Sequence, residues 1–95
     1  MQLLTKEIRE RLPLLGATDE QGMEAVAQVK FFTPDGGWTW YATEFDGKDT
    51  FFGLVIWVEK ETGYFSLSEL QSIKGALGLP VERDRFFRPT PLEQL

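Results

Sequence analysis

The sequence predicts an α+β domain in which one antiparallel sheet of four to five strands, a hairpin meander, carries a helix on one face. Aromatic and β-branched residues concentrate in the stretch 31–65, which holds all three tryptophans and is punctuated by Asp-Gly turn signals. A capped, apolar segment follows directly at Ser66. Because 95 residues suffice for one modest core, we expect residues 1–95 to form a single domain.

A short helix is predicted at the N-terminus, beginning after Thr5 and ending near Leu12. The Thr5 side chain can cap it, and Pro13 stops it because the residue before a proline avoids the α region. Apolar side chains recur at helical spacing along one stripe: Leu4, Ile8 and Leu12. We expect this helix at an end of the sheet or on its second side, followed by a polar loop over residues 16–24.

Three strands joined by two tight turns are predicted next, at residues 25–32, 38–45 and 50–59. The turn Thr33–Gly37 carries Pro-Asp-Gly-Gly, and the turn Asp46–Asp49 carries Asp-Gly; both patterns are strong hairpin signals. In the first turn we expect a glycine at positive φ.

The second and third of these strands differ in their face patterns. Strict alternation in the second places four side chains on one face: Trp38, Trp40, Ala42 and Glu44. The third is apolar on both faces, which is typical of a strand inside a sheet with material on both sides. Gly53 within it indicates a bulge or a close backbone approach.

The chain is then predicted to return to the sheet and cover it. A turn at Lys60–Gly63 leads to a short strand at Tyr64–Phe65. Ser66 and Glu69 form a capping box for a helix that continues to Lys74 and ends at Gly75. This helix is expected to pack on one face of the sheet.

Two further elements are predicted near the C-terminus. Residues Val81–Phe87 mix acidic and basic side chains, which is typical of an exposed edge strand. The segment Thr90–Glu93 repeats the capping-box pattern, with proline at the first helical position, and predicts one last helical turn.

The chain contains neither cysteine nor histidine. The commonest general base and the commonest metal ligand are therefore missing, so we expect a protein that is not an enzyme and holds no cofactor or metal. A chain without disulfides, without a signal-peptide pattern and without a long apolar run is expected in the cytoplasm, with no membrane contact. The net charge of −5 disfavours direct nucleic-acid binding, which depends on clustered basic residues.

Three carboxylates near the second hairpin turn allow two interpretations. Glu44, Asp46 and Asp49 could act as an acid–base pair or hold Mg²⁺, which would make the chain a histidine-free enzyme acting on a phosphate ester. Alternatively, Asp46 and Asp49 shape the turn while Glu44 lies on the sheet surface.

The tryptophans also allow two interpretations. Trp38 and Trp40, with Trp57 as a further candidate, either pack in a core under the helix or form a protein-binding patch. The residues that we expect to contact a partner combine these rings with the acids of both turns: Asp35, Trp38, Trp40, Glu44, Asp46 and Asp49.

Several segments together resemble one family: TPDGGWTWYATEFDG, FFGLV, GYFSLSEL, GLPVERDRFF and PTPL. They are similar to the domain of unknown function 2958 family of small bacterial proteins, and the resemblance spans Leu3 to Leu95. Members look like stand-alone products often carried on plasmids, phages and other mobile elements. The resemblance implies no activity and no catalytic residues. Because accessory proteins of mobile elements often act on host defence or plasmid maintenance, it suggests such a role.

These observations predict a non-catalytic protein that binds a protein partner through an acidic, aromatic surface. In a narrower form, the chain is a mobile-element inhibitor of a host nucleic-acid-handling or defence system, and its carboxylates stand in for phosphates. The carboxylate-dependent phosphoester enzyme is the second hypothesis. The third is a small structural subunit or a homodimer, because strand edges of a small sheet can pair across a two-fold axis.

Overall fold

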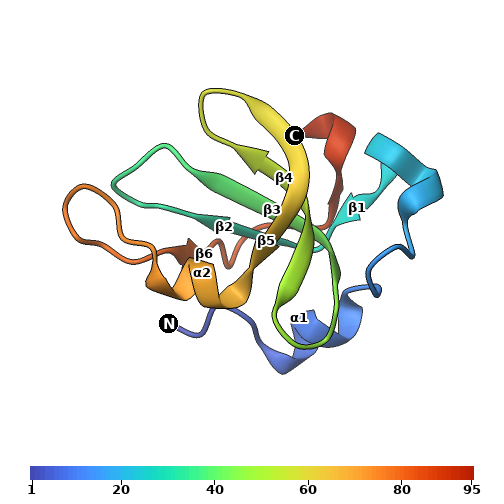
Figure 1. The fold of residues 1–95 in the computed structure, drawn as a ribbon, viewed down its shortest axis with the longest axis horizontal. Coiled ribbons are helices and arrows are strands. Elements are labelled where there is room, and N and C mark those ends of the chain that lie inside the picture. The colour runs from blue at the N-terminus through green and yellow to red at the C-terminus, as the bar shows by residue number, and fades with distance from the viewer.

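A computed structural model describes residues 1–95 and confirms the α+β class with an antiparallel sheet. Five strands form the main sheet in the order β5-β4-β3-β2-β6, and two more form a small second sheet (Figure 1). The main-sheet strands are β2 (Val29–Phe32), β3 (Thr39–Phe45), β4 (Thr50–Ile56), β5 (Lys60–Ser66) and β6 (Glu82–Arg83). The second sheet pairs β1 (Val26–Ala27) with β7 (Thr90–Pro91).

The starts of both predicted α-helices are confirmed. In α1 (Lys6–Arg11) the Thr5 hydroxyl accepts a hydrogen bond from the Ile8 amide at 3.2 Å. In α2 (Leu67–Ser72) the Ser66 hydroxyl accepts from the Glu69 amide at 3.1 Å, as a capping box requires. Two 3₁₀ helices complete the chain, η1 (Asp19–Glu24) and η2 (Leu92–Gln94). No helix has both the length and the apolar character needed to cross a membrane.

Several predicted boundaries are wrong for tertiary reasons. The strand predicted at residues 25–32 is split, because its first half pairs with β7 and its second half with β3. The turn predicted at Lys60–Gly63 lies inside β5, since the Trp57 amide bonds to the Glu59 carbonyl at 3.0 Å and closes the turn earlier. The predicted loop at residues 16–24 contains η1.

Several predictions for the C-terminal region also differ from the structure. α2 ends at Ser72 rather than Lys74, and the chain after it turns back so that Gly75 lies against the Asp35 carboxylate. The predicted edge strand at 81–87 shortens to β6. The Thr90 hydroxyl donates to the Arg88 carbonyl at 2.6 Å instead of capping η2. The positive φ expected in the first hairpin turn is absent, whereas Gly47 in the second has φ +88°.

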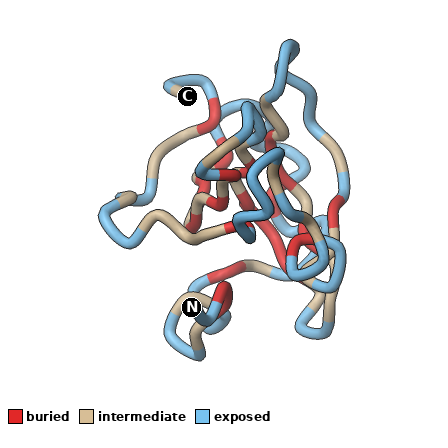
Figure 2. Tube along the Cα trace, turned by 90° about the vertical axis from the view of Figure 1, so that its left-hand side faces the viewer, coloured by how far each residue is buried: buried red, intermediate tan, exposed pale blue.

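One face of the sheet holds the main core, which Figure 2 shows as buried segments gathered at the centre of the molecule. The predicted covering by α2 is confirmed, because Leu70 is buried in this core. The N-terminal segment and α1 pack into the same core, so α1 does not cover the second side. The buried members are Leu3, Leu4, Leu12, Val29, Phe31, Trp40, Ala42, Phe45, Phe51, Phe65, Leu70 and Val81.

A smaller core lies on the second face. Its buried members are Ala27 of β1, Leu54 of β4 and Leu92 of η2, so the C-terminal segment covers part of this face. β4 therefore contributes Phe51 to one core and Leu54 to the other, which confirms that it is an interior strand covered on both sides.

A bulge at Thr43 interrupts β3. Ala42 pairs with Gly53, but Glu44 pairs with Phe52, so one residue of β3 has no counterpart. The extra residue turns Ala42 and Glu44 to opposite faces. The predicted common face for Trp38, Trp40 and Glu44 is therefore wrong at Glu44.

Gly53 lies opposite this bulge, and both alternatives predicted for it are present. A Cβ atom at Gly53 would lie 1.8 Å from the Tyr41 carbonyl oxygen. We expect Gly53→Ala to lower the free energy of unfolding by about 2–3 kcal/mol, since backbone must move to admit the methyl group. Urea unfolding followed by tryptophan fluorescence measures this change.

Gly63→Ala is the matched control for this prediction. Gly63 pairs with Gly53 on the neighbouring strand, and a Cβ atom there would meet nothing within 4 Å. Its effect should stay within about 0.5 kcal/mol. Equal losses from both substitutions would contradict the role given to the close approach at Gly53.

Candidate functional site

The two aspartates of the second hairpin turn, Asp46 and Asp49, both accept hydrogen bonds from other parts of the chain. Asp46 Oδ1 accepts from the amides of Lys48, Asp49 and Thr50 at 2.8, 2.9 and 3.0 Å. These bonds hold the pKa of the Asp46 carboxyl below its usual value. Asp49 accepts from the amide and hydroxyl of Ser68 at 2.8 and 2.7 Å and so joins the turn to the first turn of α2.

The Asp35 side chain joins a different pair of loops through hydrogen bonds. Its Oδ2 accepts from the Leu77 amide at 2.6 Å and from the Leu79 amide at 3.4 Å. The turn between β2 and β3 is thereby tied to the loop after α2, which projects at the left of Figure 1. This carboxylate positions a loop that exposes two leucine side chains, Leu77 and Leu79.

Glu44 is buried, with 1 % of its surface exposed. Its carboxylate accepts from the Gly16 and Thr18 amides, both at 2.8 Å, and from the Thr18 hydroxyl. Burial raises the pKa of this carboxyl, but the bonds from Thr18 and Gly16 lower it by more, so the pKa lies below its ordinary value. Glu44 therefore anchors the segment before η1 and is not available on the sheet surface.

The three carboxylates of the second hairpin thus serve three different backbone segments. No group of three or more acidic side chains is placed to share a metal ion. The hypothesis of an Mg²⁺-dependent enzyme required these groups to converge, and the structure does not bring them together. The interpretation of Asp46 and Asp49 as turn residues agrees with their bonds.

The three tryptophans form a continuous stack, which we call the tryptophan stack: Trp40, Trp38 and Trp57. The Trp38 ring lies 5.8 Å from Trp40 with a 15° interplanar angle, and 5.3 Å from Trp57 with a 7° angle. Trp40 is 5 % exposed, whereas Trp38 and Trp57 are 41 % and 46 % exposed. The stack therefore runs from the main core out to the surface.

Register explains why the rings meet. Trp40 pairs with Val55 and Thr39 with Ile56, so the next positions outward on β3 and β4 are Trp38 and Trp57. Side chains two apart lie on the same face of a strand, which places all three rings on the face covered by α2. The helix leaves the two outer rings, Trp38 and Trp57, exposed.

The end of α2 forms one wall beside the stack. Ile73 and Glu69 line an open hollow of about 380 Å³ together with Trp38 and Trp40. No lysine or arginine side chain lies over a tryptophan ring of the stack. The basic groups that do lie over aromatic rings are Arg9 and Lys30, elsewhere on the molecule.

Acidic side chains border the stack. Glu59 follows Trp57 in the turn to β5, Glu61 pairs with Val55, and Glu69 lines the hollow. None of them forms an ion pair, because the single ion pair of the protein joins Lys30 to Asp84. The intervening Lys60 amine instead donates to the Leu95 carbonyl at 2.6 Å. The three glutamates beside the tryptophan stack therefore have no ion-pair partner within the chain.

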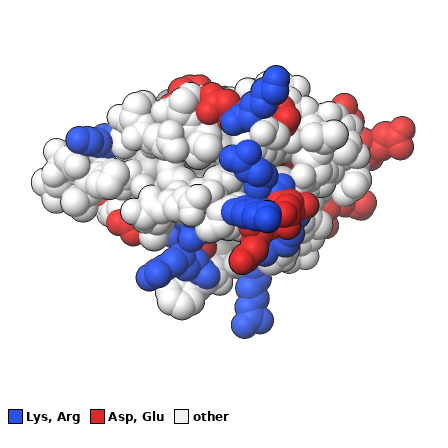
Figure 3. Space-filling view, turned by 90° about the horizontal axis from the view of Figure 1, so that it is seen from below, with Lys and Arg blue, Asp and Glu red and all other residues white.

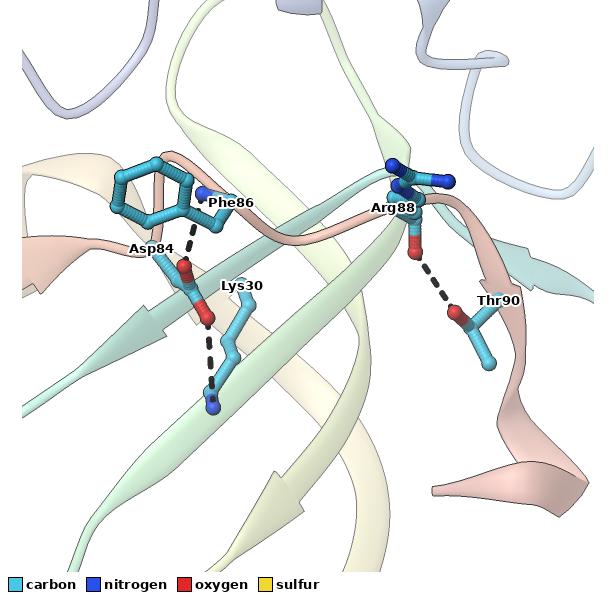
Figure 4. A network of polar contacts seen from close by, with 5 residues as sticks. All are labelled: Lys30, Asp84, Phe86, Arg88 and Thr90. Carbon is cyan, nitrogen blue, oxygen red and sulfur yellow. Dashed lines mark hydrogen bonds and ion pairs between the residues drawn. The ribbon is translucent and has the colours of Figure 1, made fainter.

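The remaining charged groups are interspersed. Figure 3 shows basic and acidic side chains side by side on the lower face, beside a mostly uncharged region at the left. The Lys30–Asp84 pair, at 3.7 Å, belongs to a local network in which Asp84 also accepts from the Phe86 amide, with the Arg88–Thr90 contact beyond it (Figure 4). These contacts fold the segment between β6 and β7.

Of the six predicted contact residues, Trp38 is the one that the structure leaves as an exposed aromatic surface, while Trp40 is buried beneath it in the main core. Three residues beside them were not in that set: Trp57, Glu69 and Ile73. Trp57 lies opposite Trp38 because of the bulge at Thr43: the register next to the turn, in which Phe45 pairs with Phe51, would place Val58 there. Glu69 and Ile73 depend on how α2 crosses the sheet, which no local signal encodes.

A family model described as a protein of unknown function (DUF2958) matches residues 3–93. Neither a curated protein nor a solved structure matches the chain.

Proposed function

We propose that this chain, which belongs to the DUF2958 family of proteins of unknown function, is a non-catalytic protein that binds a protein partner through its tryptophan stack. The family match confirms the resemblance in the sequence and brings no activity with it. The observation that carries the proposal is the exposure of Trp38 and Trp57, at 41 % and 46 %, on rings that are already held parallel.

Exposed, ordered tryptophans suit a binding surface for energetic reasons. Tryptophan is enriched among the residues that dominate interface energies, because its ring buries a large area. Stacking on Trp40 fixes Trp38 and Trp57 before a partner arrives, so little side-chain entropy remains to be lost on binding.

The charges beside the stack suggest the chemistry of the partner. Glu59, Glu61 and Glu69 have no ion-pair partner, and the outer tryptophan faces carry no cation. A lysine or arginine side chain can lie over an indole ring while its charge faces carboxylates. We therefore propose that the partner presents a basic segment.

The narrower proposal is that this partner belongs to a host nucleic-acid-handling or defence system. Its support is the role that the sequence resemblance suggests, since the family model itself is described only as a protein of unknown function. Three of the carboxylates predicted to contact a partner, Glu44, Asp46 and Asp49, accept backbone hydrogen bonds. The proposal therefore rests on the tryptophan stack and its three bordering glutamates.

Affinity capture with alanine variants tests the proposed function. We expect Trp38→Ala and Trp57→Ala to weaken binding of the captured protein by at least about 30-fold each, as for a hot-spot residue. Phe86→Ala is the matched control, because Phe86 is 87 % exposed on a distant segment. Its affinity should equal that of the unaltered chain in calorimetry.

Two results would count against this function. One is a specific partner whose affinity is unchanged by both tryptophan substitutions. The other is loss of binding by Phe86→Ala to the same extent. Weaker binding of Glu59→Gln and Glu61→Gln, with reduced salt dependence, is expected if the partner segment is basic.

A further inference from the structure

We propose that the free edge of β5 pairs with β5 of a second copy of this chain, antiparallel and about a two-fold axis at Gly63. The two five-stranded sheets then form one continuous sheet. β5 contains Glu61, which borders the tryptophan stack, but the backbone groups that pair and the positions that test the pairing belong to other residues, so this inference can be tested separately from the proposed function.

The hydrogen-bond pattern shows which backbone groups of β5 are free. The bonds Leu67 N–H to Asp49 C=O and Trp57 N–H to Glu59 C=O define the bonded positions at both ends of the β4–β5 ladder. Bonded positions alternate, so residues 61, 63 and 65 point their backbone groups toward β4. The outward-pointing backbone belongs to Lys60, Thr62, Tyr64 and Ser66.

The Ser66 carbonyl accepts the first intrahelical bond of α2, because Ser66 is the N-cap of that helix. The other outward groups form no backbone hydrogen bond to another segment, and the only strand beside β5 is β4. An open edge of seven residues is a ready template for another strand. Tyr64 on this edge is 70 % exposed although its ring packs against Phe52 at 5.0 Å.

The opposite edge of the sheet is closed. β6 has two residues, and the Arg83 amide lies 3.1 Å from the Met1 sulfur. The Arg83 guanidinium also donates to the carbonyls of Gln2 and Leu3. The N-terminal residues therefore cover β6, which leaves β5 as the one long edge that is open.

The sequence of β5 is compatible with itself in an antiparallel pair. With Gly63 on the axis, Thr62 lies opposite Tyr64 and Lys60 opposite Ser66 of the second copy, while Glu61 meets Phe65. No like charges face each other in this register, whereas an axis at Glu61 would bring two glutamates together. The 62–64 pair, formed twice, supplies four backbone hydrogen bonds, and the 60–66 pair, formed twice, supplies two more through the Ser66 amide, which makes about six in all.

A second copy fits this edge better than a single foreign strand because a two-fold pairing satisfies the same open edge in both molecules at once. At the axis the two Gly63 residues would form a non-hydrogen-bonded pair, with Cα atoms about 4.5 Å apart. A Cβ atom at Gly63 meets nothing within 4 Å, so a side chain can be introduced there without disturbing the fold.

Disulfide trapping tests the axis directly. The chain has no cysteine, so Gly63→Cys introduces a single thiol, and the expected Cα separation is within the range for a disulfide. We expect mild oxidation to convert most Gly63→Cys protein to a covalent dimer. Gly37→Cys is the control, because position 37 is exposed and unobstructed but remote from the axis; it should cross-link at least about tenfold more slowly.

Solution mass tests the same pairing without cysteine. Sedimentation equilibrium of the unaltered chain should show the mass rising from 10.9 kDa toward twice that value with concentration. Thr62→Pro removes an outward N–H, which proline tolerates at a sheet edge, and should raise the dimer dissociation constant by at least about tenfold. In Thr62→Lys/Tyr64→Lys, lysines face lysines across the axis, and this variant should be monomeric whether or not Thr62→Pro folds.

A monomeric mass at all concentrations, or equal cross-linking rates for the two cysteine variants, would overturn the proposal. So would a dimer that the double lysine variant leaves intact, since the contact would then lie elsewhere. Protection of the Thr62 and Tyr64 amides from hydrogen exchange that grows with protein concentration would support it.

Discussion

Replacing Glu44 with alanine should lower the free energy of unfolding by about 3 kcal/mol or more. The substitution removes the acceptor of two backbone amides and one hydroxyl, and each buried donor left without a partner costs about 1–3 kcal/mol. Urea unfolding at pH 7, followed by tryptophan fluorescence, measures the loss. Glu59→Ala is the control, because Glu59 is an exposed glutamate with no ion pair and should change stability by less than about 0.5 kcal/mol.

The same carboxyl contributes to the acid sensitivity of the fold. Its pKa is lowered on folding, so the unfolded state binds a proton more readily than the folded state does. The stabilisation is complete above the unfolded value near 4.5 and is lost as the pH falls through the lowered folded pKa. Glu44→Gln should therefore be less stable at pH 7 but lose less further stability below pH 4.5, with a residual slope from Asp46. An unchanged slope would contradict this account.

Phe51→Ala should have an effect of about 3–5 kcal/mol, enough to unfold much of a marginally stable domain. Phe51 is 0 % exposed, and its ring lies 4.6 Å from Phe45, 5.3 Å from Phe65 and 5.5 Å from Phe31. The substitution leaves a cavity between three strands that the surrounding rings cannot fill. Urea and thermal unfolding report the loss.

Phe86→Ala is the matched substitution for this prediction, because Phe86 is 87 % exposed. Its free energy of unfolding should remain within about 0.5 kcal/mol of that of the unaltered chain. If the two phenylalanine variants were equally stable, Phe51 could not be the centre of the main core.

The acidic residues and the tryptophans, which the sequence predicts to form one surface, fall into two groups in the structure. The carboxylates at positions 35, 44, 46 and 49 hold loops and turns through backbone hydrogen bonds. The tryptophans continue the main core to the outside, where Trp38 and Trp57 remain exposed. Binding can therefore be tested at the tryptophans with little effect on the acidic groups that stabilise the fold.

The local signals proved reliable where the physical cause is local. Thr5 and Ser66 cap helices because each hydroxyl reaches an amide only three residues away. The Asp46–Asp49 turn forms because Asp46 bonds to amides two to four residues later and Gly47 accepts a positive φ. The apolar pattern of residues 50–59 also correctly indicated an interior strand, because burial on both faces requires apolar side chains on both faces.

The sequence alone therefore determined the α+β class, the two hairpins, the two helix starts and the richness of the tryptophan region. Only the tertiary structure decided what the acidic residues do and which rings stay exposed. Glu44 bonds to amides 26 and 28 positions away, and Asp35 to amides 42 and 44 positions away. The bulge at Thr43 reverses the face of Glu44, and the segments that cover the main core leave Trp38 and Trp57 exposed. These outcomes depend on distant segments meeting in space, which the pattern of neighbouring residues does not encode.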